Sequence, residues 1–397
     1  MSGQGSGPHS TPSPTSAPSP SPEQRARGKN ALQRWYELQA GYGLLGRARA
    51  RREQRPGRYA EPPPELLPTP RFEVEGEANA APFLVTTTAG LFLWSDHGFR
   101  ALMPGTMYGL AVHADGDAAF AFQQTGGYGR IVELRGLSGL AGLSGPSGTP
   151  TVETRIWGLS RWVHQIDLVG TRLVVTDTDR NRLLFFDPPP GGVPVHASAA
   201  TRAHFVGGDA RASRESSNYH HINSVVRRGD RLYVMAHNHS VRTGRPSEMY
   251  VFDDALEDVE VLPTQGRCCH NICFADGAML WCRSLEGTLS RDGVDVARTD
   301  GFTRGLAVNG DTVLLGISRL GADRTGSAQQ AVAIEIYSRD FTRRGRITFA
   351  AGQVREIRFL RGDLGMSNTA EPEAAPGPGP GPGPGPAPDG GGRPEAR

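Results

Sequence analysis

A sixfold internal repeat is the feature that most constrains this chain. Each copy begins with a polar or aromatic residue and has Ile or Leu two places later; in the first five copies a short turn and a second apolar run follow. The copies open at Tyr108, His164, His220, His270, Arg304 and Arg355. Their spacings are 56, 56, 50, 34 and 51 residues. Units of this length cannot bury both faces alone, so they must stack on one another.

The residue pattern of the repeat region indicates the secondary structure of each unit. From about residue 82 to 360, short β-branched and apolar runs alternate with Gly-Asp, Asp-Gly and Asn-Gly turns, a pattern typical of an all-β protein built from hairpins. Periods near 40 to 50 residues with four strands each are those of propeller blades. The sequence therefore predicts an all-β, six-bladed β-propeller over residues 83–362.

The two ends of the repeat region complement each other. The sixth copy, from Arg355, has only one strand after it, whereas strand candidates at 83–88, 91–95 and 99–103 precede the first copy without an opening strand. We expect these four strands to form one blade that closes the ring between the N- and C-terminal ends and leaves no open seam. The stretches 136–150 and 197–217 are expected to be surface loops of blades one and two.

The flanking segments have a different composition. Residues 1–28 and 363–397 are rich in Ser, Pro and Gly and are predicted to be disordered. Residues 29–55 carry apolar side chains at helical spacing followed by arginines, which predicts one helix, with 56–82 as a linker. This helix either packs on the outside of the main domain or contacts a protein partner or an anionic membrane.

Composition excludes several classes of function. The net charge of +2 argues against nucleic-acid binding, and Lys29 is the only lysine, so neither a phosphate-loop lysine nor a Schiff-base lysine can lie in the repeats. No apolar run is long enough for a transmembrane segment, and no signal-peptide pattern is present, so a cytoplasmic protein is expected.

The four cysteines all fall within one span of fifteen residues and do not form a framework for disulfides: Cys268, Cys269, Cys273 and Cys282. Their spacing matches neither a zinc ribbon nor an iron–sulfur site. Cys273 and Cys282 are expected to be buried apolar residues of one blade. Whether Cys268 or Cys269 is a reactive thiol stays open at this point.

Histidines concentrate at one predicted rim of the ring. The start of the first strand of a hairpin and the end of the second lie at the same edge, and six of the eleven histidines belong to these positions: His164, His220, His221, His237, His239 and His270. Three histidines on consecutive blades, His164, His220 and His270, are predicted to bind a divalent transition metal, zinc in the first place and iron as an alternative. In the structural alternative each histidine packs among its apolar neighbours.

Other residues at this rim complete the predicted site. The residues Asp177, Asp179, His221, His237 and His239 are expected either to bind the metal or to orient its ligands, and loop capping is the alternative for the two aspartates. Arg304 and Arg355 are suited to bind a carboxylate or phosphate in a bidentate manner, and Tyr108 to transfer a proton.

These motifs resemble those of known proteins. The blades that open with His-x-Ile or His-x-Leu resemble the six-bladed propellers of the NHL-repeat, gluconolactonase/regucalcin and peptidyl-hydroxyglycine amidating lyase group. The segments His-Asn-Ile at His270 and Phe-Thr-Arg-Gly-Leu-Ala at Phe302 are similar to an uncharacterised bacterial propeller family. The resemblance to the lyase implies zinc on His164, His220 and His270, with a tyrosine and arginines beside it. The blades lack clean NHL spacing and the acidic ligand set of the gluconolactonases.

Together these observations predict a metal-dependent lyase or hydrolase acting on a small molecule or peptide end that carries an anionic group. Two alternatives stay open: a non-catalytic propeller that binds a ligand or protein partner at the same rim, and an oxidative enzyme with non-haem iron on the same three histidines.

Overall fold

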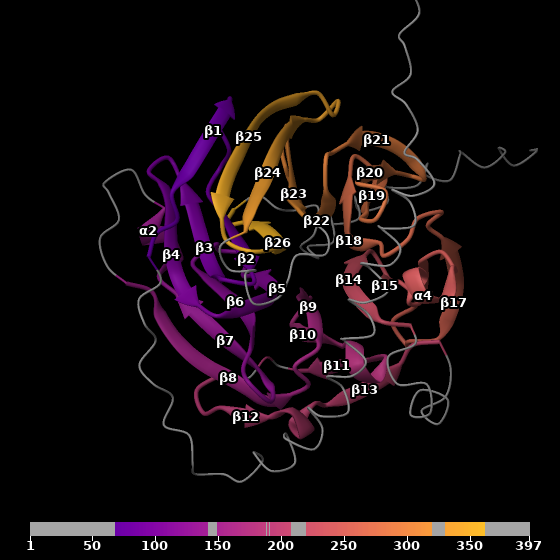
Figure 1. Ribbon diagram of the computed structural model, residues 1–397. Coiled ribbons are helices and arrows are strands. Elements are labelled where there is room, and N and C mark those ends of the chain that lie inside the picture. The colour runs from indigo at the N-terminus through magenta and orange to yellow at the C-terminus, as the bar shows by residue number, and fades with distance from the viewer. Residues whose placement is uncertain are drawn as a thin grey trace, which may run out of the picture.

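Six β-sheets are arranged around a central axis in the computed structural model (Figure 1). The structure describes residues 68–141, 149–187, 189, 191–207, 220–319 and 330–361. The inner strands of neighbouring sheets contact one another in a closed circle, in the order β5, β9, β14, β18, β22, β26 and back to β5. The chain is a six-bladed β-propeller, as the repeats predict.

The first three blades follow the chain from residue 106. Blade 1 consists of β5 (Thr106–Val112), β6 (Ala118–Gln124), β7 (Gly129–Arg135) and β8 (Thr151–Leu159), with β12 (Val195–His196) added in parallel to β8. Blade 2 consists of β9 (Val163–Val169), β10 (Arg172–Asp177), β11 (Arg182–Phe186) and β13 (Arg202–Phe205). Blade 3 consists of β14 (Ile222–Arg228), β15 (Arg231–Ala236), β16 (Glu248–Phe252) and β17 (Asp258–Pro263).

The other three blades complete the ring. Blade 4 consists of β18 (His270–Ala275), β19 (Ala278–Arg283), β20 (Thr288–Arg291) and β21 (Val294–Arg298). Blade 5 consists of β22 (Phe302–Asn309), β23 (Thr312–Ser318), β24 (Ala331–Ser338) and β25 (Arg343–Ala350), with β1 (Phe72–Gly76) on its outer edge. Blade 6 consists of β26 (Val354–Phe359), β2 (Phe83–Thr87), β3 (Gly90–Ser95) and β4 (Gly98–Pro104). Short helices lie between strands: α2 (Leu137–Leu140), η1 (Thr178–Arg180), η2 (Ala197–Ala199) and α4 (Ser240–Thr243).

Blade 6 confirms the predicted closure of the ring. The C-terminal strand β26 pairs with the N-terminal strand β2, where Ile357 lies opposite Val85. Both side chains are fully buried in the cluster that fills the seam between blades 5 and 6. The first and last strands of the ring are thus held together by a hydrogen-bonded ladder and by apolar packing.

Two strands lie where the sequence predicted none. The predicted linker 56–82 contains β1, whose five residues are all exposed, and the predicted surface loop 197–217 contains β13, the fourth strand of blade 2. Both strands alternate apolar and polar residues but are only five and four residues long, so pairing with β25 and β11 decides their conformation. The predicted helix 29–55 and the tails 1–28 and 363–397 lie outside the described residues.

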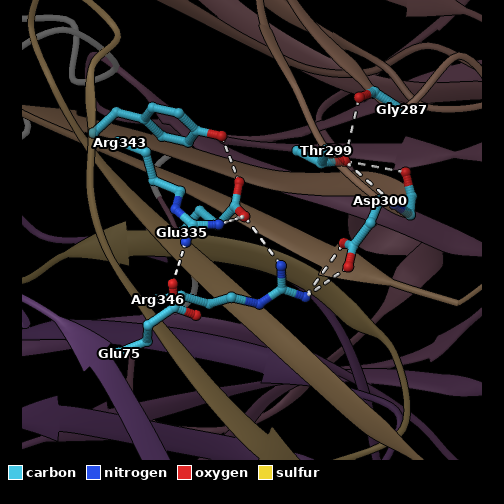
Figure 2. A network of polar contacts seen from close by, with 9 residues as sticks. Glu75, Gly287, Thr299, Asp300, Glu335, Arg343 and Arg346 are labelled. Atoms are coloured by element: carbon cyan, nitrogen blue, oxygen red, sulfur yellow. Dashed lines mark hydrogen bonds and ion pairs between the residues drawn. The ribbon is translucent and has the colours of Figure 1, made fainter. Parts of the chain in front are cut away.

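Ion pairs around the buried Glu335 join β1 to blade 5 and blade 5 to blade 4 (Figure 2). Glu335 of β24 accepts hydrogen bonds from Arg343 at 3.2 Å, from Arg346 at 3.1 Å and from the hydroxyl of Tyr337. Arg343 also bonds Glu75 of β1, and Arg346 also bonds Asp300, which follows blade 4. A single buried carboxylate therefore organises the outer edge of this part of the ring.

Candidate functional site

The opening residue of every inner strand lies beside a bulge in the ladder. The pairing of each inner strand with its neighbour shifts register close to these residues in all six blades. A bulge leaves an extra residue out of the ladder and re-aims the side chains next to it. This local irregularity positions the rim residues.

The register of blade 3 differs from the prediction. Counted back from the hairpin turns, where Arg228 pairs with Arg231 and Ala275 with Ala278, Val225 is equivalent to Ile272. The residue two places earlier, equivalent to His270, is therefore Asn223 and not His220. The expectation that His220 occupies the third equivalent position is wrong by three residues, because polar-x-aliphatic patterns occur twice in succession in this segment.

His220 also lies outside the group of rim histidines. Its Nδ1 atom is 3.3 Å from Asn238 Oδ1 and 3.4 Å from the Tyr250 hydroxyl, so it packs within blade 3. Its chain neighbour His221 turns to the rim instead, with a left-handed φ of 48°. The His221 amide donates to Asn181 Oδ1 at 3.0 Å, which holds this conformation.

Five imidazole rings form a cluster at the rim, contributed by blades 2, 3 and 4. We call this the histidine cluster; its members are His164, His221, His237, His239 and His270. The ring centroids of His164 and His221 are 4.6 Å apart, those of His221 and His237 4.0 Å, and those of His237 and His270 6.0 Å. The cluster thus includes His221, His237 and His239, which the sequence placed in a supporting position.

Hydrogen bonding orients one ring of the cluster and leaves two others unsatisfied. His270 Nδ1 lies 2.7 Å from the carbonyl oxygen of Cys268 and 3.0 Å from Ser284 Oγ. A carbonyl only accepts, so Nδ1 carries the proton and Nε2 of the neutral ring keeps its lone pair. The Nδ1 atoms of His164 and His221 are buried with no hydrogen-bond partner among the described residues. Buried polar atoms of this kind call for a ligand, an ion or a water.

Burial favours the neutral form of four rings of the cluster, those of His164, His221, His237 and His270. It holds the pKa of His237 at about 3, with the charge of His239 adding to the effect. It also lowers the pKa values of His164 and His270, where Arg304 adds to the effect, and that of His221, where His237 does. Neutral imidazole is the form that binds a metal.

Arg304, Arg355 and Tyr108 lie on the other side of the axis beside His164. The Tyr108 ring stacks on the ring of His164 at 5.4 Å, and the guanidinium carbons of Arg355 and Arg304 lie 4.6 and 5.6 Å from the centre of the Tyr108 ring. Burial, together with the nearby Arg355, lowers the pKa of Arg304 to about 9. Neither arginine forms an ion pair with the described part of the chain, and Arg355 Nε is buried without a partner.

A second polar layer lies next to the cluster and was not predicted. Glu356 Oε2 accepts from Asn271 Nδ2 at 3.0 Å and from Gln165 Nε2 at 3.3 Å, and Glu356 also pairs with Arg358. Each of these residues except Arg358 directly follows an opening residue of a repeat. The buried polar residue that follows the opening residue in three repeats is the sequence signal that could have predicted this layer.

The two predicted supporting aspartates have polar partners near blade 2. Asp177 is fully buried and pairs with Arg182 at 2.8 Å and Arg180 at 3.1 Å, and Asp179 lies beside Ser160. The ion pairs of Asp177 give it a structural role in blade 2.

The four cysteines are free and buried. As expected, Cys273 and Cys282 pack in an apolar cluster of blade 4. Burial raises the pKa of Cys269 to about 12 and raises that of Cys282 as well. Neither of these two thiols is in the thiolate form that attacks an electrophile at neutral pH.

Among the described residues, no three His, Cys, Asp or Glu side chains are placed to hold an ion together. In the same segments, no helix has the length and apolar character needed to cross a bilayer.

Solved structures similar to this chain have low sequence identity to it. A search for a matching protein family and a search of curated sequences each find none. Similar structures include a nidogen/laminin complex (11% identity, TM-score 0.47, covering 70% of this chain and 98% of that one) and a putative TolB from Agrobacterium tumefaciens (12%, 0.47, 71% and 95%). A calcium-binding protein, regucalcin, from Agrobacterium tumefaciens is also similar (12%, 0.38, 60% and 73%).

Proposed function

We propose that the histidine cluster binds a divalent transition metal ion, zinc or iron, and that Arg304 and Arg355 bind an anionic group beside it. On this proposal the protein is a metal-dependent lyase or hydrolase. The observation that carries the proposal is the convergence of buried, neutral imidazoles from three blades, of which His164 and His221 have an unsatisfied nitrogen.

The imidazole nitrogens of the histidine cluster are donors of the type that such an ion binds. With Zn–N bonds of about 2.1 Å, two imidazoles on one ion have centroids roughly 4.5 to 6.5 Å apart. The pairs His164–His221 at 4.6 Å, His237–His270 at 6.0 Å and His164–His270 at 6.4 Å fall in this range. Binding requires the rings to turn about their side-chain torsions, since no three now stand in ligand positions. The bond from His270 to the Cys268 carbonyl is the kind of contact that orients metal-binding histidines.

The arginines and the tyrosine have separate roles in this proposal. Two guanidinium groups without a carboxylate partner among the described residues attract an anion. Arg304 is buried, Arg355 is half-buried, and both approach the same aromatic ring. Tyr108, stacked on His164, is the residue that delivers or accepts a proton. A bound divalent ion would supply Lewis acidity and lower the pKa of a bound water.

A second candidate is a non-catalytic propeller that binds a ligand or protein at this rim. The near-complete burial of Tyr108, His164, His270 and Arg304, each at most 6% exposed, favours it. A buried layer of polar side chains of this kind can line the propeller axis with its hydrogen bonds satisfied internally.

Metal content separates the two candidates. The chain is purified without added metal, dialysed against zinc and then against buffer, and its metal is measured by mass spectrometry. We expect about one ion per chain, its loss in His221→Ala and His270→Ala, and its retention in His220→Ala, because His220 lies outside the cluster. Trace metal in the parent that neither variant changes would remove the enzyme proposal.

A further inference from the structure

A pocket of about 160 Å³ lies between blades 2 and 3, at the end of the propeller opposite the histidine cluster. It is formed where the hairpins β9–β10 and β14–β15 turn, next to β11, β13 and the turn after β16. Its floor is apolar, formed by the buried side chains of Val169, Phe185, Leu232 and Leu256. The whole pocket, including its charged rim, has about the volume of a cavity that holds a benzene ring, so it has room for one small ligand.

The rim of the pocket carries both signs of charge. Two arginines are already paired: Arg172 with Asp187 at 2.8 Å, and Arg227 with Asp254 at 2.9 Å. The exposed Arg202 has no carboxylate partner among the described residues and bonds only the carbonyl oxygen of Ala255.

Asp253 is a carboxylate at the pocket rim that, like Arg202, has no oppositely charged partner among the described residues. It forms no ion pair with the described residues, and its Oδ1 accepts only the amide of Glu257, at 2.9 Å. An unpaired cation and an unpaired anion therefore line one small pocket without bonding each other. A ligand that carries both opposite charges can bond both at once.

The backbone beside Asp253 is held in a disfavoured conformation. Leu256 has a left-handed φ of 62°, which is unfavourable for a residue with a Cβ atom, and its amide donates to the Asp253 carbonyl oxygen at 3.0 Å. This turn places an apolar side chain on the pocket floor and Asp253 at the rim. Such strained turns cluster at ligand sites.

We propose that this pocket binds a zwitterionic α-amino acid with a branched or aromatic hydrocarbon side chain. The carboxylate of the ligand bonds Arg202, its ammonium group bonds Asp253, and its side chain packs on Phe185, Leu232 and Leu256. The site is separate from the histidine cluster and independent of any metal there.

Calorimetric titration of the full chain tests the charge assignment. L-leucine is compared with 4-methylpentanoate, which lacks the ammonium group, with isopentylamine, which lacks the carboxylate, and with glycine, which lacks the side chain. We expect leucine to bind at least about tenfold more tightly than each analogue, because each loses a charged hydrogen bond or the apolar contact.

Two conservative variants assign each charge to its partner. Arg202→Gln should weaken leucine about tenfold or more but leave isopentylamine unchanged, and Asp253→Asn should weaken leucine while leaving 4-methylpentanoate unchanged. Asn keeps an oxygen for the Glu257 amide, and equal thermal unfolding midpoints check the fold of both variants. Arg298→Gln, an exposed arginine of blade 4, is the matched control and should bind like the parent.

Three results would overturn the proposal. The first is no binding of leucine at millimolar concentration, and the second is binding that both variants leave unchanged. The third is binding that His270→Ala abolishes, which would move the ligand to the opposite rim. Since leucine binding and metal content are measured separately, failure of either proposal leaves the other standing.

Discussion

The imidazole ring of His221 lies 4.0 Å from that of His237, centroid to centroid, and is tilted by 33°. The two residues come from the entry to β14 and the end of β15, the paired inner strands of blade 3. The left-handed conformation of His221 is what brings the rings together. Two buried imidazoles at this distance cannot both be protonated at low cost.

Stability is therefore expected to fall in acid. Burial holds the pKa of His237 at about 3, below its unfolded value near 6.5, so the unfolded chain binds more protons between these pH values. The stability that the neutral His237 contributes to the folded state is fully present above pH 6.5 and is lost as the pH falls towards 3. Between pH 7.5 and 5, the free energy of unfolding of His237→Gln should fall by about 2 kcal/mol less than that of the parent. Urea unfolding at the two pH values measures both decreases.

The exposed His97 provides the control for this experiment. His97→Gln should keep the pH dependence of the parent. Equal slopes for the parent and His237→Gln would show that His237 is charged at no extra cost in the native state.

Glu335 and Glu75 both bond Arg343, but they differ in burial (Figure 2). The Glu335 side chain is 3% exposed and that of Glu75 is 68% exposed. Arg343 and Arg346 are 41% and 21% exposed and keep Glu75 and Asp300 as partners, so Glu335→Ala removes charged hydrogen bonds and should cost about 1.5–3 kcal/mol of unfolding free energy. Glu75→Ala should cost about 0–1 kcal/mol. Chemical denaturation of both variants measures the difference, and equal costs would contradict the assignment of Glu335 as the organising carboxylate.

The cysteines are expected to be inert in the native protein. All four are buried, and burial raises the pKa values of Cys269 and Cys282. Iodoacetamide at pH 8 should label none of them within an hour, and all four after unfolding in guanidinium, as counted by mass spectrometry. Rapid labelling of Cys268 in the native state would instead identify it as a nucleophile at the rim.

Much of the fold could be predicted from the sequence because every repeat unit has the same physical requirement. Each unit has two faces to bury, and only stacking around a ring satisfies six such units. The closure of blade 6 followed from counting strands, and β26 pairs with β2 as expected. The strands β1 and β13 escaped prediction because their conformation comes from β25 and β11, which are distant in the sequence.

The site was only partly predictable. His164, His270, Arg304, Arg355 and Tyr108 lie together, whereas His221 stands where His220 was expected. Adjacent histidines in an irregular entry segment cannot be told apart by pattern, because a single change of φ exchanges their directions. Metal binding, catalysis and the role of residues 29–55 stay predictions.

By itself, the sequence determined the number of blades, the closure of the ring and the rim at which histidines and arginines gather, since hydrophobic periodicity and turn spacing are local properties of the chain. Only the tertiary structure decided which histidine faces the axis and how Glu356 joins Gln165 and Asn271. These depend on a bulge and on hydrogen bonds such as that from His221 to Asn181, which form between residues far apart in the chain only after the blades have packed.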